Sequence, residues 1–423
     1  MTYRMKCWTL VLCLLPGWGH LYAQAAGELL LAPYLRAVAQ QNLAYAAERY
    51  NVNIAEAAVE SARAFPDPSL TIGGYDNQQR LLQLGQGYNL GLAATLELGG
   101  KRHARIAVAR GQLELSKALL QDYFRNLQAD AALAYFRALQ LRNHLDVLKG
   151  SYTAMRQLAE ADSLRLQFGA VTAVDAAQSN LEAMSLRSEL YQAEAEWKAA
   201  LLQLSQLMGR PVTDTLAAPV PDFPELQRSF SLPELIRLGQ ESRADVVAAA
   251  RASTLALRNL DLVKANRSPD VGIAAGILYA GEATNNIAPT PGYRSASAGI
   301  TIPLRYSNRY KGDLKAARSV IGQSAVRQEQ AALQVQQEVA QAFLYYSAAG
   351  QTVAQYRSGL LSEAARVWEG KKYSYQRGQS SLLELLLARR TYNDVQQAYY
   401  EVLYRYAAAL VELERSAGIW DIY

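Results

Sequence analysis

The chain has few of the residues that carry covalent and metal chemistry. Among 423 residues there are two cysteines, three histidines and five methionines. Cys7 and Cys13 both lie within the first 25 residues, and only His103 and His144 lie beyond them among the histidines. These two histidines have no metal-ligand spacing such as HExxH, so we predict surface positions for both. The sequence therefore predicts no enzyme activity, no metal site and no cofactor.

The chain also lacks an excess of either charge. It has 43 Lys and Arg against 38 Asp and Glu, and without residues 1–25 the counts are 41 and 38, a net charge of +3. Such a balance excludes the basic surface that binds nucleic acid. Beyond residue 25 no run approaches the ~20 apolar residues of a membrane-spanning helix.

Residues 1–25 have the pattern of a secretory signal peptide. Arg4 and Lys6 form a positive start, Trp8 to Leu15 an apolar run, and Ala23-Gln24-Ala25 a small-residue cleavage site. The exported chain would then contain no cysteine and no disulfide. Neither cysteine has the small neighbours of a lipidation site. The expected location is therefore the periplasm, the exterior, or an outer membrane crossed by β-strands.

The remaining chain carries one plan twice. Pro33-Tyr34-Leu35 returns as Pro233-Glu234-Leu235, and FGAVTAVD at 168–175 returns as RGQSSLLE at 377–384. A period this long excludes a solenoid of short repeats and indicates a duplicated half. We predict a first repeat at 26–209, a linker at 210–230, a second repeat at 231–418 and a tail at 419–423.

Each repeat is predicted to run helix, strand, loop, strand, very long helix, turn, long helix. The opening helices are expected at about Ala32 to Ala64 and Leu232 to Ala265, the second begun by a Ser231–Glu234 capping box. Proline-free segments from Lys101 to Phe168 and from Asn308 to Arg377 predict helices of roughly 100 Å each. Gly99-Gly100-Lys101 lacks the spacing of a phosphate loop and is expected to make a strand-to-helix turn.

Four segments alternate apolar with small or polar residues, which predicts β-strands. The clearest are Tyr88 to Leu98 and Ser295 to Leu304, and their partners begin at Leu70 and Val271. Their lengths approach the ~9–11 residues of a membrane-crossing strand. Tyrosines near the strand ends are placed as in the aromatic girdles of membrane barrels: Tyr75, Tyr88, Tyr279 and Tyr293.

Four such strands cannot close a barrel, because a sheet in lipid must have no open edge and needs at least about eight strands. Two chains would give a barrel filled by its own side chains, and three would give twelve strands around a lumen. Long helical hairpins would continue that wall as a tube. The alternative is a soluble sheet on a periplasmic coiled-coil scaffold or adhesin.

Two motifs add a family resemblance. ARAFPDPSL at 62–70 leads into the first strand, and LELGGKRHAR at 96–105 follows the second. With the duplicated order of elements, they resemble the TolC-type outer-membrane efflux proteins, and LELGGKR is similar to the branch that serves heavy-metal and cation pumps of the RND type. The resemblance covers essentially the whole exported chain.

The resemblance implies an α+β membrane protein in the outer membrane of a Gram-negative bacterium. It implies a homotrimer with a twelve-stranded β-barrel, four strands per chain, continued by an α-helical coiled-coil barrel in the periplasm. A periplasmic adaptor (membrane fusion protein) and an inner-membrane pump would open its closed end. The implied cargo is a cation or a drug, and a duct for type I protein secretion remains an alternative.

The turns at the far ends of the helical hairpins are the sharpest local signals. In each, a glycine ends one helix and a Thr or Ser followed by an acid begins the next. From the residues we predict helix caps, and the resemblance implies that the tips dock the adaptor. The tip residues are Gly169, Thr172, Asp175, Gly378, Ser381 and Glu384.

The resemblance also suggests a gate on the second-repeat helices. The candidate gate residues are charged, and in a gate the acids and arginines would pair between protomers. They are Glu363, Glu369, Arg389, Arg390 and Asp394. The alternative is that these charges form a solvated helix face. The apolar seam of the first hairpin is rich in Leu and Ala, and that of the second in Tyr and Val. This contrast suggests that one hairpin moves and the other is fixed.

Overall fold

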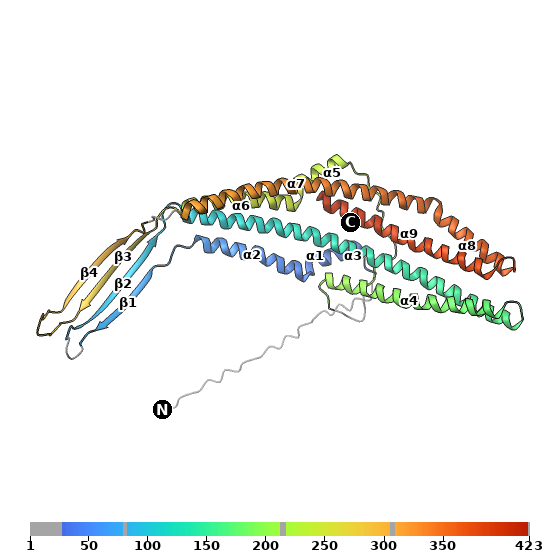
Figure 1. Cartoon of the computed structure of the whole chain (residues 1–423), viewed down its shortest axis with the longest axis horizontal. Coiled ribbons are helices and arrows are strands. Elements are labelled where there is room, and N and C mark those ends of the chain that lie inside the picture. The colour runs from blue at the N-terminus through green and yellow to red at the C-terminus, as the bar shows by residue number, and fades with distance from the viewer. Residues whose placement is uncertain (1–27, 79–82, 212–216, 305–308, 422–423) are drawn as a thin grey trace, which may run out of the picture.

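The structure is a computed structural model that describes residues 28–78, 83–211, 217–304 and 309–421. The predicted signal peptide, including Cys7 and Cys13, lies outside the described residues. The molecule is elongated, with a β-sheet at one end, two helical hairpin tips at the other, and long helices between them (Figure 1).

Each repeat contributes one β-hairpin to a single four-stranded sheet. The strands are β1 (Ser69–Asp76), β2 (Gln86–Leu96), β3 (Val271–Ala280) and β4 (Tyr293–Thr301). They lie in sequence order and every pair is antiparallel, with Leu90 opposite Ile277 where the two repeats meet. The sheet is open, since β1 and β4 each have one edge that no described strand pairs with.

The two faces of the sheet differ in chemistry. Residues opposite each other across strands share a face, and one face carries Leu70, Ile72, Leu90, Leu92, Ile273, Ile277 and Ile300. These side chains are 41% to 75% exposed, so none of the described residues covers this face. The other face carries small or polar residues such as Gly91, Gly276 and Ser297.

The tyrosines near the strand ends divide between these faces. Tyr88 lies opposite Tyr279 on the apolar face, as the girdle prediction requires. Tyr75 and Tyr293 project from the other face, because they pair with Gly87 and Ala280. An aromatic girdle on the apolar face would therefore contain Tyr88 and Tyr279 but not Tyr75 and Tyr293.

The opening helix of each repeat is broken, where one continuous helix was predicted. The pieces are α1 (Leu31–Gln41) with α2 (Leu43–Arg63), and α5 (Leu232–Ser242) with α6 (Ala244–Ala265). Asn42 and Arg243, at the two breaks, have extended backbone angles. The Asn42 side chain caps α2 by accepting a hydrogen bond from the Tyr45 amide at 2.9 Å.

Both breaks are held by the end of the last helix of the same repeat. Asn42 Nδ2 donates to the Leu207 carbonyl at 2.9 Å, and Arg243 Nη1 donates to the Ser416 carbonyl at 3.1 Å. The repeats therefore carry the same joint, closed by unrelated side chains. These contacts join residues far apart in the chain, which is why helical periodicity did not predict the breaks.

The capping box expected at Ser231 does not form. Ser231 precedes α5, but its side chain makes no capping hydrogen bond. Glu234 instead forms an ion pair with Arg237 at 2.6 Å, one helical turn further on. The acid is thus engaged along the helix and does not fold back over its start.

The long helices form two hairpins that differ in regularity. The first joins α3 (Lys101–Gln167) to α4 (Ala173–Leu207), and α3 runs for 67 residues without a break. The second joins α7 (Arg309–Gln355), a π-helical turn η1 (Tyr356–Leu360) and α8 (Leu361–Gln376) to α9 (Leu382–Ala417). Gly99 and Gly100 have φ of 75° and 73° and make the predicted turn into α3. No helix within the described residues is long and apolar enough to cross a membrane.

The main core lies where the opening helices meet the long ones. Its fully buried members come from both repeats and include Tyr34, Phe136, Leu139, Leu204, Val335, Val339, Leu410 and Leu413. The described part of the linker straps across this core. Phe223 stacks on Phe136, with ring centroids 6.2 Å apart, and the Tyr346 hydroxyl donates to the Leu226 carbonyl at 2.9 Å.

Candidate functional site at the helical hairpin tips

The two hairpin tips have the same backbone geometry. Gly169 and Gly378 have φ of 68° and 71°, in the left-handed region that glycine adopts without strain. The Gly169 amide donates to the Leu166 carbonyl, and the Gly378 amide makes the equivalent bond to Tyr375, both at 3.0 Å. These bonds satisfy carbonyls that the helix end leaves free.

Each returning helix is capped as the sequence predicts. Thr172 Oγ1 accepts a hydrogen bond from the Asp175 amide at 3.0 Å, and Ser381 Oγ accepts one from the Glu384 amide at 3.3 Å. A cap of this kind contributes about 1 kcal/mol. The side chains of the two acids have different partners. Asp175 accepts a hydrogen bond from the Thr172 hydroxyl, whereas Glu384 forms an ion pair with Lys371 at 2.6 Å.

The tips lie side by side and line a common cavity of about 560 Å³. Five of the six predicted tip residues contribute to its wall, namely Gly169, Thr172, Asp175, Gly378 and Ser381. Glu384 lies outside this wall. The remaining lining includes Arg165 and Tyr375, which the sequence did not single out.

A buried polar contact links the two hairpins just behind the tips. The Tyr375 hydroxyl donates to Asp162 Oδ1 at 3.0 Å, and the Asp162 side chain is fully buried. Arg165 lies 3.5 Å from the same carboxylate. Burial, together with the Asp162 charge, raises the pKa of Tyr375 to about 12, so the hydroxyl keeps its proton.

The sequence held one signal for this contact. Asp162 follows Met155 and Ala159 at the spacing of a buried helical stripe, which is an unusual position for a carboxylate. A second link lies further along the same face, where Ser151 Oγ donates to Asn393 Oδ1 at 2.7 Å. Both residues of this second link are buried.

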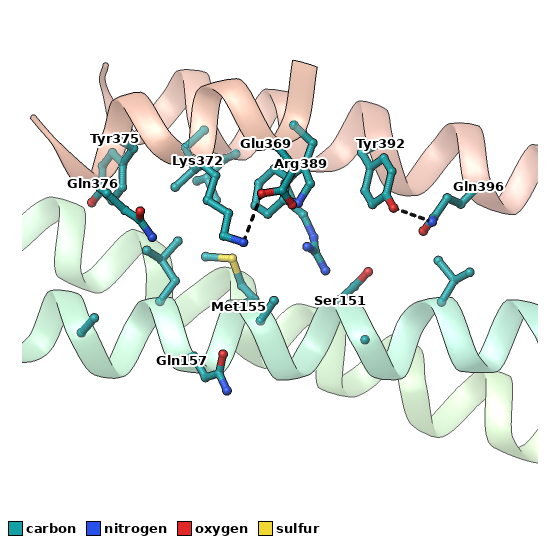
Figure 2. A pocket seen from close by; sticks show the side chains of 18 of the residues that line it. Ser151, Met155, Gln157, Glu369, Lys372, Tyr375, Gln376, Arg389, Tyr392 and Gln396 are labelled. Atoms are coloured by element: carbon teal, nitrogen blue, oxygen red, sulfur yellow. Dashed lines mark hydrogen bonds and ion pairs between the residues drawn. The ribbon is translucent and has the colours of Figure 1, made fainter. Parts of the chain in front are cut away.

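The five gate candidates divide into two groups. Glu369 and Arg389 line a cavity between the hairpins, where Glu369 pairs with Lys372 at 3.4 Å and Arg389 lies over the Trp368 ring at 4.7 Å (Figure 2). Burial lowers the pKa of Arg389. Glu363, Arg390 and Asp394 do not line this cavity; they are exposed, as Glu369 is, and Glu363 pairs with Arg366. Within the described residues Arg390 and Asp394 have no ion-pair partner.

The histidines and carboxylates form no metal cluster of three or more among the described residues. His103 is exposed, as predicted. His144 is half-buried, so its surface prediction is wrong, and burial lowers its pKa. Its position in the middle of α3, beneath the neighbouring helices, explains the difference.

Comparisons with known proteins agree with this arrangement. The model of a family described as outer membrane efflux protein matches residues 34–210 and 235–419. The cobalt-zinc-cadmium resistance protein CzcC of Cupriavidus metallidurans is 25% identical over 410 residues, covering 93% of this chain and 91% of CzcC.

Solved structures show the same fold at lower identity. The open state of the MtrE outer membrane channel of Neisseria gonorrhoeae has a TM-score of 0.74 at 19% identity, covering 92% of this chain and 89% of MtrE. The CmeC outer membrane channel of Campylobacter jejuni has a TM-score of 0.75 at 15% identity, covering 92% and 85%. The predicted α+β fold with a tandem duplication is confirmed.

Proposed function

Because the chain belongs to the outer membrane efflux protein family, we propose that it is the outer-membrane channel of a tripartite efflux system. It conducts substrate passively from a periplasmic adaptor and an inner-membrane pump to the exterior, without catalysis or a cofactor of its own. The observation that carries this proposal is the open four-stranded sheet with one exposed apolar face.

Three copies complete the channel. The free edges of β1 and β4 would pair between neighbouring chains and leave no unpaired strand in lipid. Twelve strands then enclose a lumen. The apolar face with Leu70 and Ile277 would contact lipid, and the face with Gly276 and Ser297 would line the pore. The alternative is a periplasmic scaffold or adhesin. In that case the apolar side chains of this face, which are 41% to 75% exposed, would be left in water.

The repeats supply equivalent wall segments of this tube. We retain the predicted boundaries of 26–209 and 231–418, with 210–230 as linker, 419–423 as tail and 1–25 as signal peptide. Attachment to the membrane is proposed to depend on the strands and their exposed apolar face. Near-balanced charge supports the absence of nucleic acid among its partners.

The tip cavity is the proposed adaptor-docking surface. Gly169, Thr172, Gly378 and Ser381 place two capped turns beside each other, and a partner that contacts one tip also reaches the second. Asp175 adds a negative charge at this end of the molecule, whereas the charge of Glu384 is balanced by Lys371.

The gate is proposed at the second hairpin. Arg390 and Asp394 are exposed and without ion-pair partners in the described chain, so they are free to pair with a neighbouring protomer. Glu363 and Glu369 form exposed ion pairs within α8, with Arg366 and Lys372, and can exchange them for a partner on a neighbouring protomer, whereas Arg389 lies over the Trp368 ring.

The cargo proposed is a metal cation or a drug. The similarity to CzcC, a cobalt-zinc-cadmium resistance protein, favours cations. A passive duct requires no metal ligands, because the pump selects the cargo. Conduction of secreted polypeptides by a type I system is the second candidate within the same architecture.

Fractionation tests the proposal directly. A detergent-extracted species that migrates as a trimer before heating and as a monomer afterwards, and that conducts ions in planar bilayers, is the expected result. A water-soluble periplasmic species would contradict it and favour the scaffold. Growth of a deletion strain on cobalt, zinc and cadmium salts, compared with growth on drugs, separates the cargo classes.

A further inference from the structure

A second cavity lies between the two hairpins, with a wall from each of them. It has a volume of about 690 Å³ and lies between α3 on one side and α8 with α9 on the other (Figure 2). Much of its lining is apolar or aromatic, including Met155, Leu158, Trp368, Leu386, Tyr392 and Tyr400. Cavities of ~300–1,000 Å³ with such linings and a few polar groups hold small molecules.

Among the described residues Arg389 is the one cation of this wall that forms no ion pair; the Glu369 carboxylate acts on it electrostatically but forms its ion pair with Lys372. The Arg389 guanidinium lies over the Trp368 ring at 4.7 Å, and its Nε atom is shielded from solvent with no hydrogen-bond partner. The other charged lining residues each have an ion-pair partner, as Arg165 with Asp162, Lys372 with Glu369, and Asp146 with Lys149.

An unpaired, partly buried guanidinium favours one ligand chemistry. Removing a cation from water costs several kcal/mol unless an anion compensates it. A carboxylate matches the planar fork of arginine and can accept two hydrogen bonds from it. Lys372 extends from α8 into the same space and would add a second donor (Figure 2). The stacked Trp368 and Tyr392 rings, 6.5 Å apart between centroids, offer an aromatic surface beside the charge.

We propose that this cavity binds a small amphipathic carboxylate, with its charge on Arg389 and its apolar body against Trp368 and Tyr392. The volume favours a small molecule over a partner helix, since a helix is about 10 Å wide with its side chains and needs a longer, open groove.

Ligand binding has a consequence for conduction, and this part rests on the proposed function. The ligand would contact α3 of the first hairpin and α8 and α9 of the second at once. It would therefore hold the hairpins together beside the Ser151–Asn393 contact and oppose their separation. Ligand binding can be measured without any assay of conduction. A protein that binds the ligand but does not conduct, or conducts but does not bind it, would therefore be recognised.

Isothermal titration of the detergent-purified full-length protein with naphthalene-2-carboxylate tests the site. We expect saturable binding, one probe per protomer, and at least about tenfold weaker binding of naphthalene-2-carboxamide, which lacks the charge. Arg389→Gln should weaken carboxylate binding by a similar factor. Arg405→Gln is the matched control, since it removes the same charge from an exposed position of α9 outside the cavity and should leave affinity unchanged.

A second variant keeps the test decisive if Arg389→Gln does not assemble. Ala154 lines the cavity from α3, and Ala154→Phe would fill it while leaving Arg389 in place, so probe binding should be lost. The proposal is overturned if the wild-type protein does not bind the carboxylate, including the case in which a neighbouring copy already occupies Arg389. It is also overturned if carboxamide and carboxylate bind equally, or if Arg389→Gln and Arg405→Gln behave alike.

Discussion

The two hairpins share a tip geometry and differ in the helix that leads to it. An offset of 209 residues aligns Gly169 with Gly378 and also aligns Gly150 with Gly359. Gly150 lies in the unbroken α-helix α3, whereas Gly359 lies in the π-helical turn η1. Figure 1 shows that α8 departs from the line of α7 after this turn. The hairpin tip thus follows an unbroken helix in the first repeat and a helix that bends at η1 in the second.

The difference indicates which hairpin can move. A π-turn widens the helix and interrupts its regular hydrogen bonds, and such turns often lie at functional sites. Around η1, Arg357 Nε donates to the Tyr399 hydroxyl at 3.2 Å, and no residue of the turn is buried. The corresponding stretch of α3 includes buried Ser151, which bonds Asn393 of the second hairpin. We infer that the first hairpin is the fixed wall and the second bends at η1.

The largest expected effect comes from disrupting the glycine turn that both hairpin tips share. Gly169→Pro and Gly378→Pro each force φ near −65° where the chain has 68° and 71°, and each removes the amide that donates to the preceding helix. We expect loss of efflux-dependent resistance with trimers still present in the outer membrane. Gly→Asn at either position, which tolerates this conformation, is the control. Unchanged resistance in the proline variants would remove the tips from adaptor docking.

A pH effect from a buried carboxyl group is expected at one position of the second repeat and not at the equivalent position of the first. Glu414 is fully buried at the end of α9, and the same offset places the neutral Ser205 in the first repeat. Burial raises the pKa of Glu414 to about 7. Between about pH 4.5 and 7 the unfolded chain releases this proton while the folded chain retains it, so the free energy of unfolding falls as pH rises.

Thermal unfolding followed by circular dichroism measures this effect. The Glu414→Gln variant should lose that part of the pH dependence and be more stable than wild type at pH 8, by on the order of 2–3 kcal/mol. It keeps an acceptor for the Asp421 amide, which bonds Glu414 Oε2 at 2.8 Å. Equal slopes between pH 4.5 and 7 in both proteins would contradict the assignment.

The contact between the hairpins gives a third test. Tyr375→Phe leaves the buried Asp162 carboxylate without its hydroxyl donor, which should cost about 1–3 kcal/mol. If the second hairpin moves, the variant should also raise the open probability of the channel in planar bilayers. Asp162→Asn, which keeps an acceptor, should have the smaller effect on both measurements. A lower melting temperature with unaltered conductance would make this contact structural only.

The smallest expected effect compares the helices themselves. A Cβ at Gly359 or at Gly150 meets no atom within 4 Å, so alanine fits at either position. Alanine favours regular helix by about 1 kcal/mol over glycine, and Gly359→Ala should therefore reduce opening by up to about fivefold. Gly150→Ala makes the same change in the straight helix and should leave efflux unaltered. Equal efflux in the two variants would contradict a hinge at η1.

The features that the sequence predicted correctly have local causes. Alternation specified the strands, and a glycine followed by Thr172 or Ser381 specified the caps, because each signal involves neighbouring residues. The breaks at Asn42 and Arg243, the π-turn and the Tyr375–Asp162 contact escaped prediction. The two breaks and the Tyr375–Asp162 contact each depend on a helix that lies far away in the chain, as Asn42 depends on the helix that ends at Leu207. Periodicity reports which face of a helix is apolar, and not where a distant partner bends it.

The joints at Asn42 and Arg243 also bear on how such a chain can arise. Each joint ties the beginning of a repeat to its own end, through the carbonyls of Leu207 and Ser416. A unit whose ends already meet can be copied and fused head to tail through a short connector without distorting either copy. Each repeat is therefore a unit closed on itself, and because Asn42 and Arg243 are buried, an insertion or a chain break is expected to be tolerated between the repeats and not at either joint.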